Sequence, residues 1–313
     1  MITGFGRDLA IITLVLLVFG ILFYAIQRRK QSLRQKHESV SSLGNVLSVY
    51  FHLYSIAIYR GQDFEWKQPL PSYFLAQLPS KIPYDPNVHA PIRHQWIVEQ
   101  ISEEKLVTLR SDAAWFVNED DLQKIWDGMH PLVHRILEEA LVQSELKKTV
   151  KIPVIHFRCA DTPFCRHDKY HFQKYIFFRD ALQGHDKVIL LSCHTHNSRA
   201  DWTDACRQYS DSLRNYLTGI GVQVTVQCHE SNLKDFATMF YAPLVISTGS
   251  SFSFMAGYFG HGTFHSAGHV HDPEMTSPLS SLPPWMRYDT DVGHQQVSDY
   301  LNVPSVIKLL HTS

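Results

Sequence analysis

PVIHF, at residues 153–157, is a short apolar run of the kind that forms a buried strand. Three similar runs follow it along the chain: KVILLS at 187–192, VQVTVQ at 222–227 and LVIS at 244–247. The segments between the runs are predicted to be helices: 170–182, 202–217 and 232–241. Strands that alternate with helices of about ten or more residues form parallel sheets. The sequence therefore predicts an α/β fold, with a Rossmann-like domain over residues 151–313.

The region before this domain is less regular, and we expect it to form an N-terminal domain over residues 44–150. Apolar residues recur at helical spacing in 44–61 and in 120–150, which predicts a helix in each segment. Residues 62–110 are rich in proline, a composition that favours loops around short strands.

The first 26 residues predict a membrane anchor. Leu9–Ile26 is uncharged, and a helix of that length is just able to cross a bilayer; a buried core helix is the alternative. Residues 27–43 are basic and then serine-rich, as expected of a stalk. More Lys and Arg follow the anchor than precede it, which favours a single-pass protein with a cytoplasmic body. In a eukaryote we expect the Golgi or endoplasmic reticulum membrane.

The composition of the 313 residues excludes two broad classes. With 29 Lys+Arg against 30 Asp+Glu, the net charge of −1 lacks the basic excess of a general nucleic-acid binder. An apolar fraction of 44% and an aromatic fraction of 12% exclude a mainly disordered chain. The five cysteines are an odd number in a large chain, so we expect core or site residues rather than a disulfide framework.

A first candidate motif follows the strand at 153–157 directly. Arg158 and Asp161 fall at its carboxyl end, where ligands of parallel sheets bind. The planar guanidinium of an arginine makes paired hydrogen bonds to phosphate oxygens, and Asp161 could orient it or accept a proton. A structural salt bridge at the strand end is the alternative.

A second motif, VISTGSSFS at 245–253, runs from a strand through a Gly-Ser turn into a predicted helix at 254–259. Glycine lets a ligand approach the backbone, and helix N-termini present N–H groups to anions. The motif is therefore a candidate anion-binding site. The alternative is a serine-rich helix cap with no ligand.

In order and spacing, these motifs resemble those of the α1,2-, α1,6- and protein O-fucosyltransferases. In that superfamily His-x-Arg-Arg-x-Asp opens the second Rossmann domain, and His156-x-Arg158-x-x-Asp161 is similar to it. Asp235, ahead of the VISTGSSFS turn, resembles an aspartate that heads a helix in the family. Gly44-Asn45 is similar to the Gly-Asn opening of the α1,2 branch. The resemblance covers residues 42–64 faintly and 153–260 more fully.

The resemblance implies a membrane-anchored, GT-B-like inverting glycosyltransferase with two Rossmann-like domains, the first of them reduced. It would transfer fucose from GDP-fucose to a glycan or protein hydroxyl, without a cofactor or a metal. Cys159 departs from the family pattern, because many members have a second arginine at that position.

Residue by residue, the resemblance assigns Arg158 to the donor diphosphate. Arg158 and Asp161 are the candidate catalytic residues, and a carboxylate or histidine of the first half is the alternative to Asp161 as base. As the sugar–phosphate bond breaks, charge grows on the phosphate, and a preplaced guanidinium stabilises the transition state. On the donor side the resemblance also assigns Asp235, Ser250, Ser251 and Phe252. His156 belongs to the donor side with its role left open. On the acceptor side the resemblance assigns Gly44 and Asn45.

The 19 histidines offer an alternative function. His261, His265, His269, His271 and Asp272 form a dense run that could hold zinc in a metal-dependent hydrolase, although glycines interrupt it. A flexible loop with solvated or hydrogen-bonded histidines is the favoured interpretation of the run. The third alternative is a non-catalytic relative that binds a nucleotide sugar or a glycan.

Overall fold

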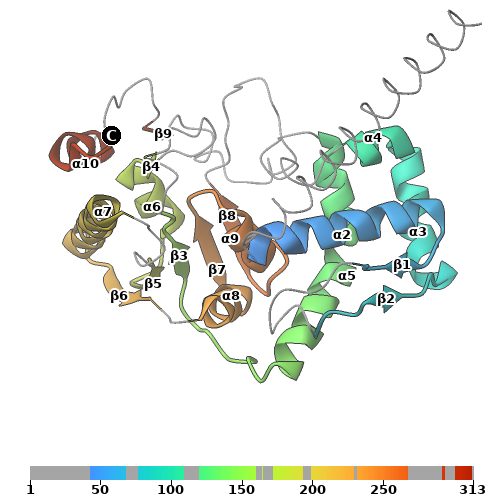
Figure 1. The fold of residues 1–313 in the computed structure, drawn as a ribbon. Coiled ribbons are helices and arrows are strands. Elements are labelled where there is room, and N and C mark those ends of the chain that lie inside the picture. Colours follow the sequence, from blue (N-terminus) through green and yellow to red (C-terminus); the bar gives the residue numbers. More distant parts are fainter. Residues whose placement is uncertain are drawn as a thin grey trace, which may run out of the picture. The chain divides into compact units, whose positions relative to one another are not determined.

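The computed structural model describes residues 43–67, 77–108, 120–159, 164, 172–192, 199–228, 231–266, 291–292 and 300–311. Leu43–Ser313 forms one compact unit (Figure 1). The predicted anchor at 1–26 and nearly all of the stalk at 27–43 lie outside the described residues. Among the helices that are described, none has the length and apolar character needed to cross a bilayer.

A five-stranded parallel sheet forms the centre of the C-terminal half and confirms the predicted α/β class. Its strands lie in the order β6-β5-β3-β7-β8. They are β3 (Val154–His156), β5 (Lys187–Leu191), β6 (Gln223–Gln227), β7 (Leu244–Ser247) and β8 (Thr263–Ser266). The first four coincide with the predicted runs. β8 was not predicted, because TFHS lies within the histidine-rich run.

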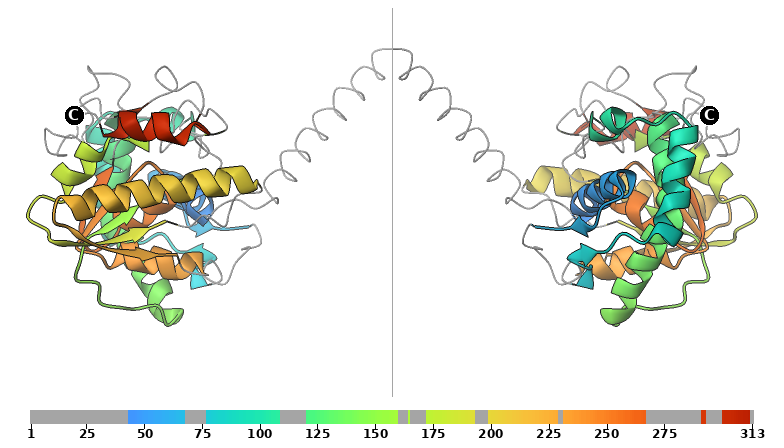
Figure 2. Two further views of the ribbon diagram at one scale, coloured as in Figure 1. Left: turned by 90° about the vertical axis from the view of Figure 1, so that its left-hand side faces the viewer. Right: turned by 90° about the vertical axis from the view of Figure 1, so that its right-hand side faces the viewer.

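Helices cover both faces of this sheet, because alternate residues of each strand point to opposite faces. Val154 and Val245 belong to one apolar cluster, whereas Ile155 and Ile246 belong to the other. On the first face lie α8 (Asn232–Phe240) and α9 (Ser251–Gly257); on the second lie α6 (Tyr175–Ala181), α7 (Ala200–Gly219) and α10 (Val303–Leu310). Figure 2 shows α7 and α10 on the side opposite α2 and α5.

The described residues before β3 form helices and one antiparallel strand pair. The helices are α2 (Leu43–Arg60), α3 (Pro86–Val98), α4 (Glu103–Thr108) and α5 (Asp120–Gln143), and β1 (Phe64–Glu65) pairs with β2 (Lys81–Ile82). Their core is continuous with the first face of the sheet. For example, Trp126 of α5 contacts Phe259 with a ring separation of 5.6 Å.

A second strand pair, β4 (Phe172–Gln173) with β9 (Asp291–Val292), lies apart from the main sheet. Tyr300, just before α10, packs its ring on Phe172 at 5.7 Å. Phe172 in turn stacks on Phe157, 5.6 Å away, so this edge of the molecule supports the segment that follows β3.

The expectation that the cysteines are unpaired is wrong. Cys159 and Cys206 form a disulfide with an S–S distance of 2.07 Å, and Cys228 is also disulfide-bonded. The prediction failed because 47 residues separate Cys159 from Cys206. Only the packing of α7 on the sheet brings the two thiols together.

Candidate functional site

The first two motifs meet at the carboxyl edge of the sheet. β3 and β7 are adjacent and parallel, with His156 opposite Ser247. Arg158 follows β3 and Ser250 follows β7, so the two side chains emerge at the same edge. The Arg158 Nη1 atom donates to Ser250 Oγ at 3.2 Å. The alternative of a structural strand-end ion pair between Arg158 and Asp161 is not tested, because Asp161 lies outside the described residues.

The turn after β7 is held by its own hydroxyl groups. Thr248 Oγ1 accepts from the Arg158 amide at 2.9 Å, which ties the ends of β3 and β7 together. Gly249 has φ +89°, a conformation that favours glycine. Ser247 Oγ and Ser253 Oγ are 2.7 Å apart. These contacts hold the turn from within.

Ser250 also caps α9, since its Oγ accepts from the Phe252 amide at 3.3 Å. The predicted helix at 254–259 thus begins earlier, at Ser251. The helix cap that we named as the alternative to a binding role is therefore present. The same Ser250 oxygen also accepts a hydrogen bond from Arg158. Ser250 can therefore cap α9 and orient the Arg158 side chain at the same time.

Gly44 and Asn45, at the start of α2, join the same turn although they lie some two hundred residues away in sequence. Ser251 Oγ donates to Asn45 Oδ1 at 2.8 Å. A Cβ atom on Gly44 would lie only 2.4 Å from the Phe252 nitrogen, so α2 approaches the turn as closely as glycine permits. Figure 1 shows the beginning of α2 against α9.

Two aromatic rings pack near Phe252 in this turn. The Phe252 ring lies 5.7 Å from the His156 ring and 5.7 Å from that of Phe236. Burial, reinforced by the charge of Arg158, lowers the pKa of His156 to about 3. His156 is therefore neutral at pH 7 and adds no positive charge for a phosphate.

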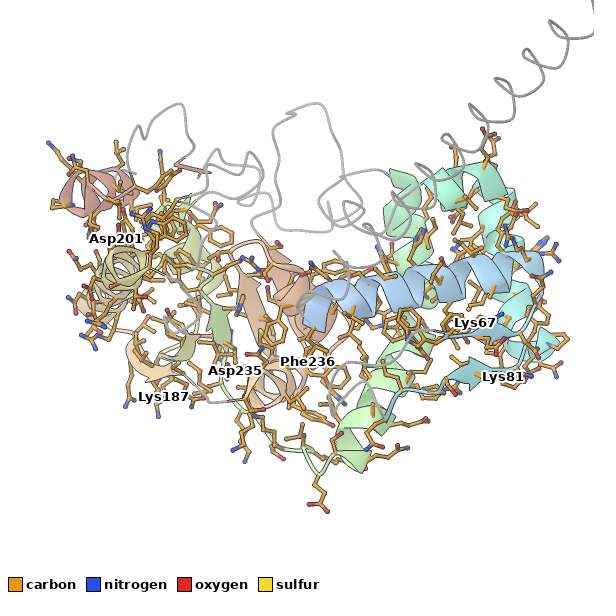
Figure 3. The ribbon with its side chains drawn as sticks, in the orientation of Figure 1. Lys67, Lys81, Lys187, Asp201, Asp235 and Phe236 are labelled. Carbon is orange, nitrogen blue, oxygen red and sulfur yellow. A yellow bond between two sulfur atoms is a disulfide. The ribbon has the colours of Figure 1, made fainter. Side chains whose placement is uncertain are left out.

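Asp235 lies on α8 and is nearly buried, with an exposed fraction of 9%. Figure 3 shows Asp235 next to Phe236 on this helix. Lys148, from the segment after α5, donates to the Lys234 carbonyl at 3.1 Å and contacts Thr238. Burial lowers the pKa of Lys148, and the charge of Asp235 acts against that shift. Sequence reasoning missed Lys148, because no motif marks a lysine in a loop.

A disulfide fixes the residue that follows Arg158. The Cys159 side chain is buried and bonded to Cys206 on α7, so it is directed into the core. The bond anchors the residue that follows Arg158 to a long helix. Arg158 thereby remains the one arginine of this motif that can serve a ligand at the edge of the sheet.

The histidine-rich run is placed only in part. His265 lies on β8 opposite Ile246, and burial lowers its pKa to about 4. His261 precedes the strand and is exposed, with its Nε2 atom 3.3 Å from Glu138 of α5. His269, His271 and Asp272 lie outside the described residues, so the zinc site predicted for the whole run is not tested.

Comparison of the chain with family models, with curated proteins and with solved structures gives no match.

Proposed function

We propose that the protein binds a nucleoside diphosphate sugar, GDP-fucose in the first instance, and transfers the sugar with inversion to a glycan or protein hydroxyl. One observation carries the proposal. Three short motifs that are far apart in sequence, at Gly44-Asn45, Arg158 and Ser250–Phe252, are joined by hydrogen bonds and close contact at the carboxyl edge of a parallel sheet. This edge is where such sheets bind nucleotides.

The chemistry in this proposal rests on Arg158. Ser250 orients its guanidinium, and the Thr248 hydroxyl fixes its backbone. A guanidinium held in place stabilises the negative charge that develops on the leaving diphosphate, at little cost in reorganisation. Asp161 is the proposed base for the acceptor hydroxyl. Asp235 on α8 is proposed to contact the guanine, with Phe252 lining the nucleotide pocket.

The two-domain GT-B arrangement belongs to the same proposal. The sheet of residues 154–266 is assigned to the donor, and the helices of residues 43–143 to the acceptor. The donor chemistry as proposed uses no metal. Asp289-Thr290-Asp291 nevertheless offers two closely spaced carboxylates, so transfer is to be measured with and without EDTA. Loss of transfer in EDTA would reject the metal-free mechanism.

Arg158→Ala tests the proposal, with Arg207→Ala as the matched control, because Arg207 is an exposed arginine on α7 paired with Asp204. We expect GDP and GDP-fucose to raise the melting temperature of the wild type and of Arg207→Ala, but not of Arg158→Ala. Arg158→Lys should bind more weakly than the wild type, because an ammonium cannot bind two oxygens in parallel.

Two outcomes contradict the proposal. If Arg158→Ala keeps the circular dichroism and the GDP response of the wild type, the arginine does not bind the donor. If GDP-fucose binds but no acceptor is modified and no GDP is released, the protein is a non-catalytic nucleotide-sugar binder.

A further inference from the structure

A second group of polar side chains lies at the opposite edge of the sheet. His134 and Glu138 are four residues apart on one face of α5, and His261 precedes β8. Because β8 runs parallel to β7, its beginning lies at the amino edge, away from Arg158 and Ser250. The group therefore takes no part in the proposed donor site.

The spacing of this group suits a metal ion. The Glu138 carboxylate directs Oε2 toward His134 Nε2 at 3.7 Å and Oε1 toward His261 Nε2 at 3.3 Å. One ligand atom from each residue lies within 4.8 Å of the other two. A tetrahedral zinc ion with bonds of about 2.0–2.1 Å separates its ligand atoms by about 3.3 Å. The two distances to the Glu138 carboxylate, 3.7 and 3.3 Å, are close to that separation.

The orientation of His134 is fixed in the way that metal-binding histidines require. Its Nδ1 atom lies 2.8 Å from the Phe259 carbonyl oxygen, which can only accept, so Nδ1 carries the proton. The Nε2 atom of the same ring then faces the Glu138 carboxylate and is the nitrogen available to a metal ion. A backbone carbonyl that holds the far nitrogen is a common outer partner of zinc ligands.

Tyr241 supplies an independent observation. Its ring stacks on His261 at 5.1 Å, and its hydroxyl oxygen is buried without a hydrogen-bond partner among the described residues. A water molecule in the fourth position of a metal ion would give the hydroxyl a partner.

We propose that His134, Glu138 and His261 bind one zinc ion, with a water molecule as the fourth ligand. Two imidazoles, one carboxylate and a water form a ligand set that zinc uses in proteins. The ion would join α5 to the turn between α9 and β8. His130 and His134 already bind this turn through the carbonyl oxygens of Tyr258 and Phe259. In this proposal the zinc ion holds α5 on the sheet.

The full-length chain, stripped with a chelator and dialysed against Zn²⁺, tests this site. We expect one zinc per chain by elemental analysis, and a melting temperature that rises with the zinc concentration. Co²⁺ in place of zinc should give the visible absorption of a tetrahedral centre. Glu138→Gln and His261→Gln should each weaken zinc binding at least about tenfold.

Glu139→Gln and His185→Gln are the matched controls, because both residues are exposed and neither belongs to the group. They should bind zinc as the wild type does. If Glu138→Gln binds zinc with the affinity of the wild type, the proposal is wrong, and the zinc is bound by other histidines. The proposal is also wrong if the folded wild-type chain binds no zinc. Protons shared between the histidines and Glu138 would then join the three side chains. Neither result bears on GDP binding.

Discussion

At the residue scale, burial decides the charge of two histidines in the sheet. The pKa of His156 is lowered to about 3 by burial and Arg158, and that of His265 to about 4 by burial. In the unfolded chain both should titrate near pH 6.5. As the pH falls from 7 to 5, the unfolded state binds protons that the folded state does not bind. Folding therefore loses stability, by about 2 kcal/mol for each histidine at pH 5.

Urea unfolding of the wild type and of His265→Leu at pH 7, 6 and 5 measures this effect. Burial also lowers the pKa values of His52, His89 and His130, so the wild type should lose stability through several groups. The variant should lose about 2 kcal/mol less than the wild type between pH 7 and pH 5. Exposed His185→Gln should follow the wild type. Equal losses in wild type and His265→Leu would show that His265 titrates normally in the fold.

Single residues also show how far the sequence predicts the site. Arg158 and Ser250 could be selected because each follows an apolar strand, and parallel strands end at one edge. Lys148 could not, since its partners lie on α8. Glu138 could not be selected for its contact with His261 either, because that residue comes from another element. Cys159 was misjudged for the same reason. A bond to Cys206 requires the packing of a helix that the local sequence does not specify.

At the element scale, α2 and α9 approach each other so closely at Gly44 that a Cβ atom there would overlap the Phe252 backbone. We predict that Gly44→Ala destabilises the protein by about 1–3 kcal/mol, because the new methyl group would meet the Phe252 backbone at 2.4 Å. The displaced turn carries Ser250, so the variant should also respond less to GDP. Urea unfolding and the thermal shift with GDP measure the two effects.

Gly219→Ala is the control for this substitution. Gly219 is the last residue of α7, and a Cβ atom there would have no neighbour within 4 Å. Alanine should leave stability unchanged or raise it by up to about 1 kcal/mol. If Gly44→Ala proved as stable as Gly219→Ala, the close approach of α2 would have no energetic importance.

Elements with a plain apolar pattern were predicted well, and those set by tertiary contacts were not. The four strand runs and the helices near 44–61 and 120–150 follow from local periodicity. β8 was missed because TFHS lies within the histidine-rich run, and its buried pair Phe264–His265 carries no plain apolar pattern. α9 begins three residues before its predicted start, because serine side chains form the cap.

At the scale of the whole molecule, the two halves of the described chain share a core. One apolar cluster contains residues of α2 and α5 together with residues of α8 and α9. The sequence predicts a boundary near residue 150, but it does not predict that α2 packs on the turn after β7. That contact brings the faint motif at Gly44-Asn45 to the stronger one at Ser250–Phe252.

The disulfide between Cys159 and Cys206 bears on where the protein resides in the cell. Cytosolic glutathione and thioredoxin keep thiols reduced, whereas disulfides persist in the secretory lumen and outside the cell. The bond therefore favours a luminal or external body, opposite to the orientation that the basic residues after Ile26 favour. A reporter of glycosylation separates the two, since the chain contains no Asn-x-Ser/Thr sequence.

Gly184→Asn with Asp186→Ser creates such a sequence in an exposed turn, where the positive φ of 85° also suits asparagine. In a eukaryotic host we expect this variant to gain a glycan that a glycosidase removes, and Gly184→Asn alone to gain none. An unmodified double variant would place the body in the cytoplasm. The Cys159–Cys206 disulfide thus bears on which side of the membrane the body of the protein lies, and glycosylation of the double variant tests it.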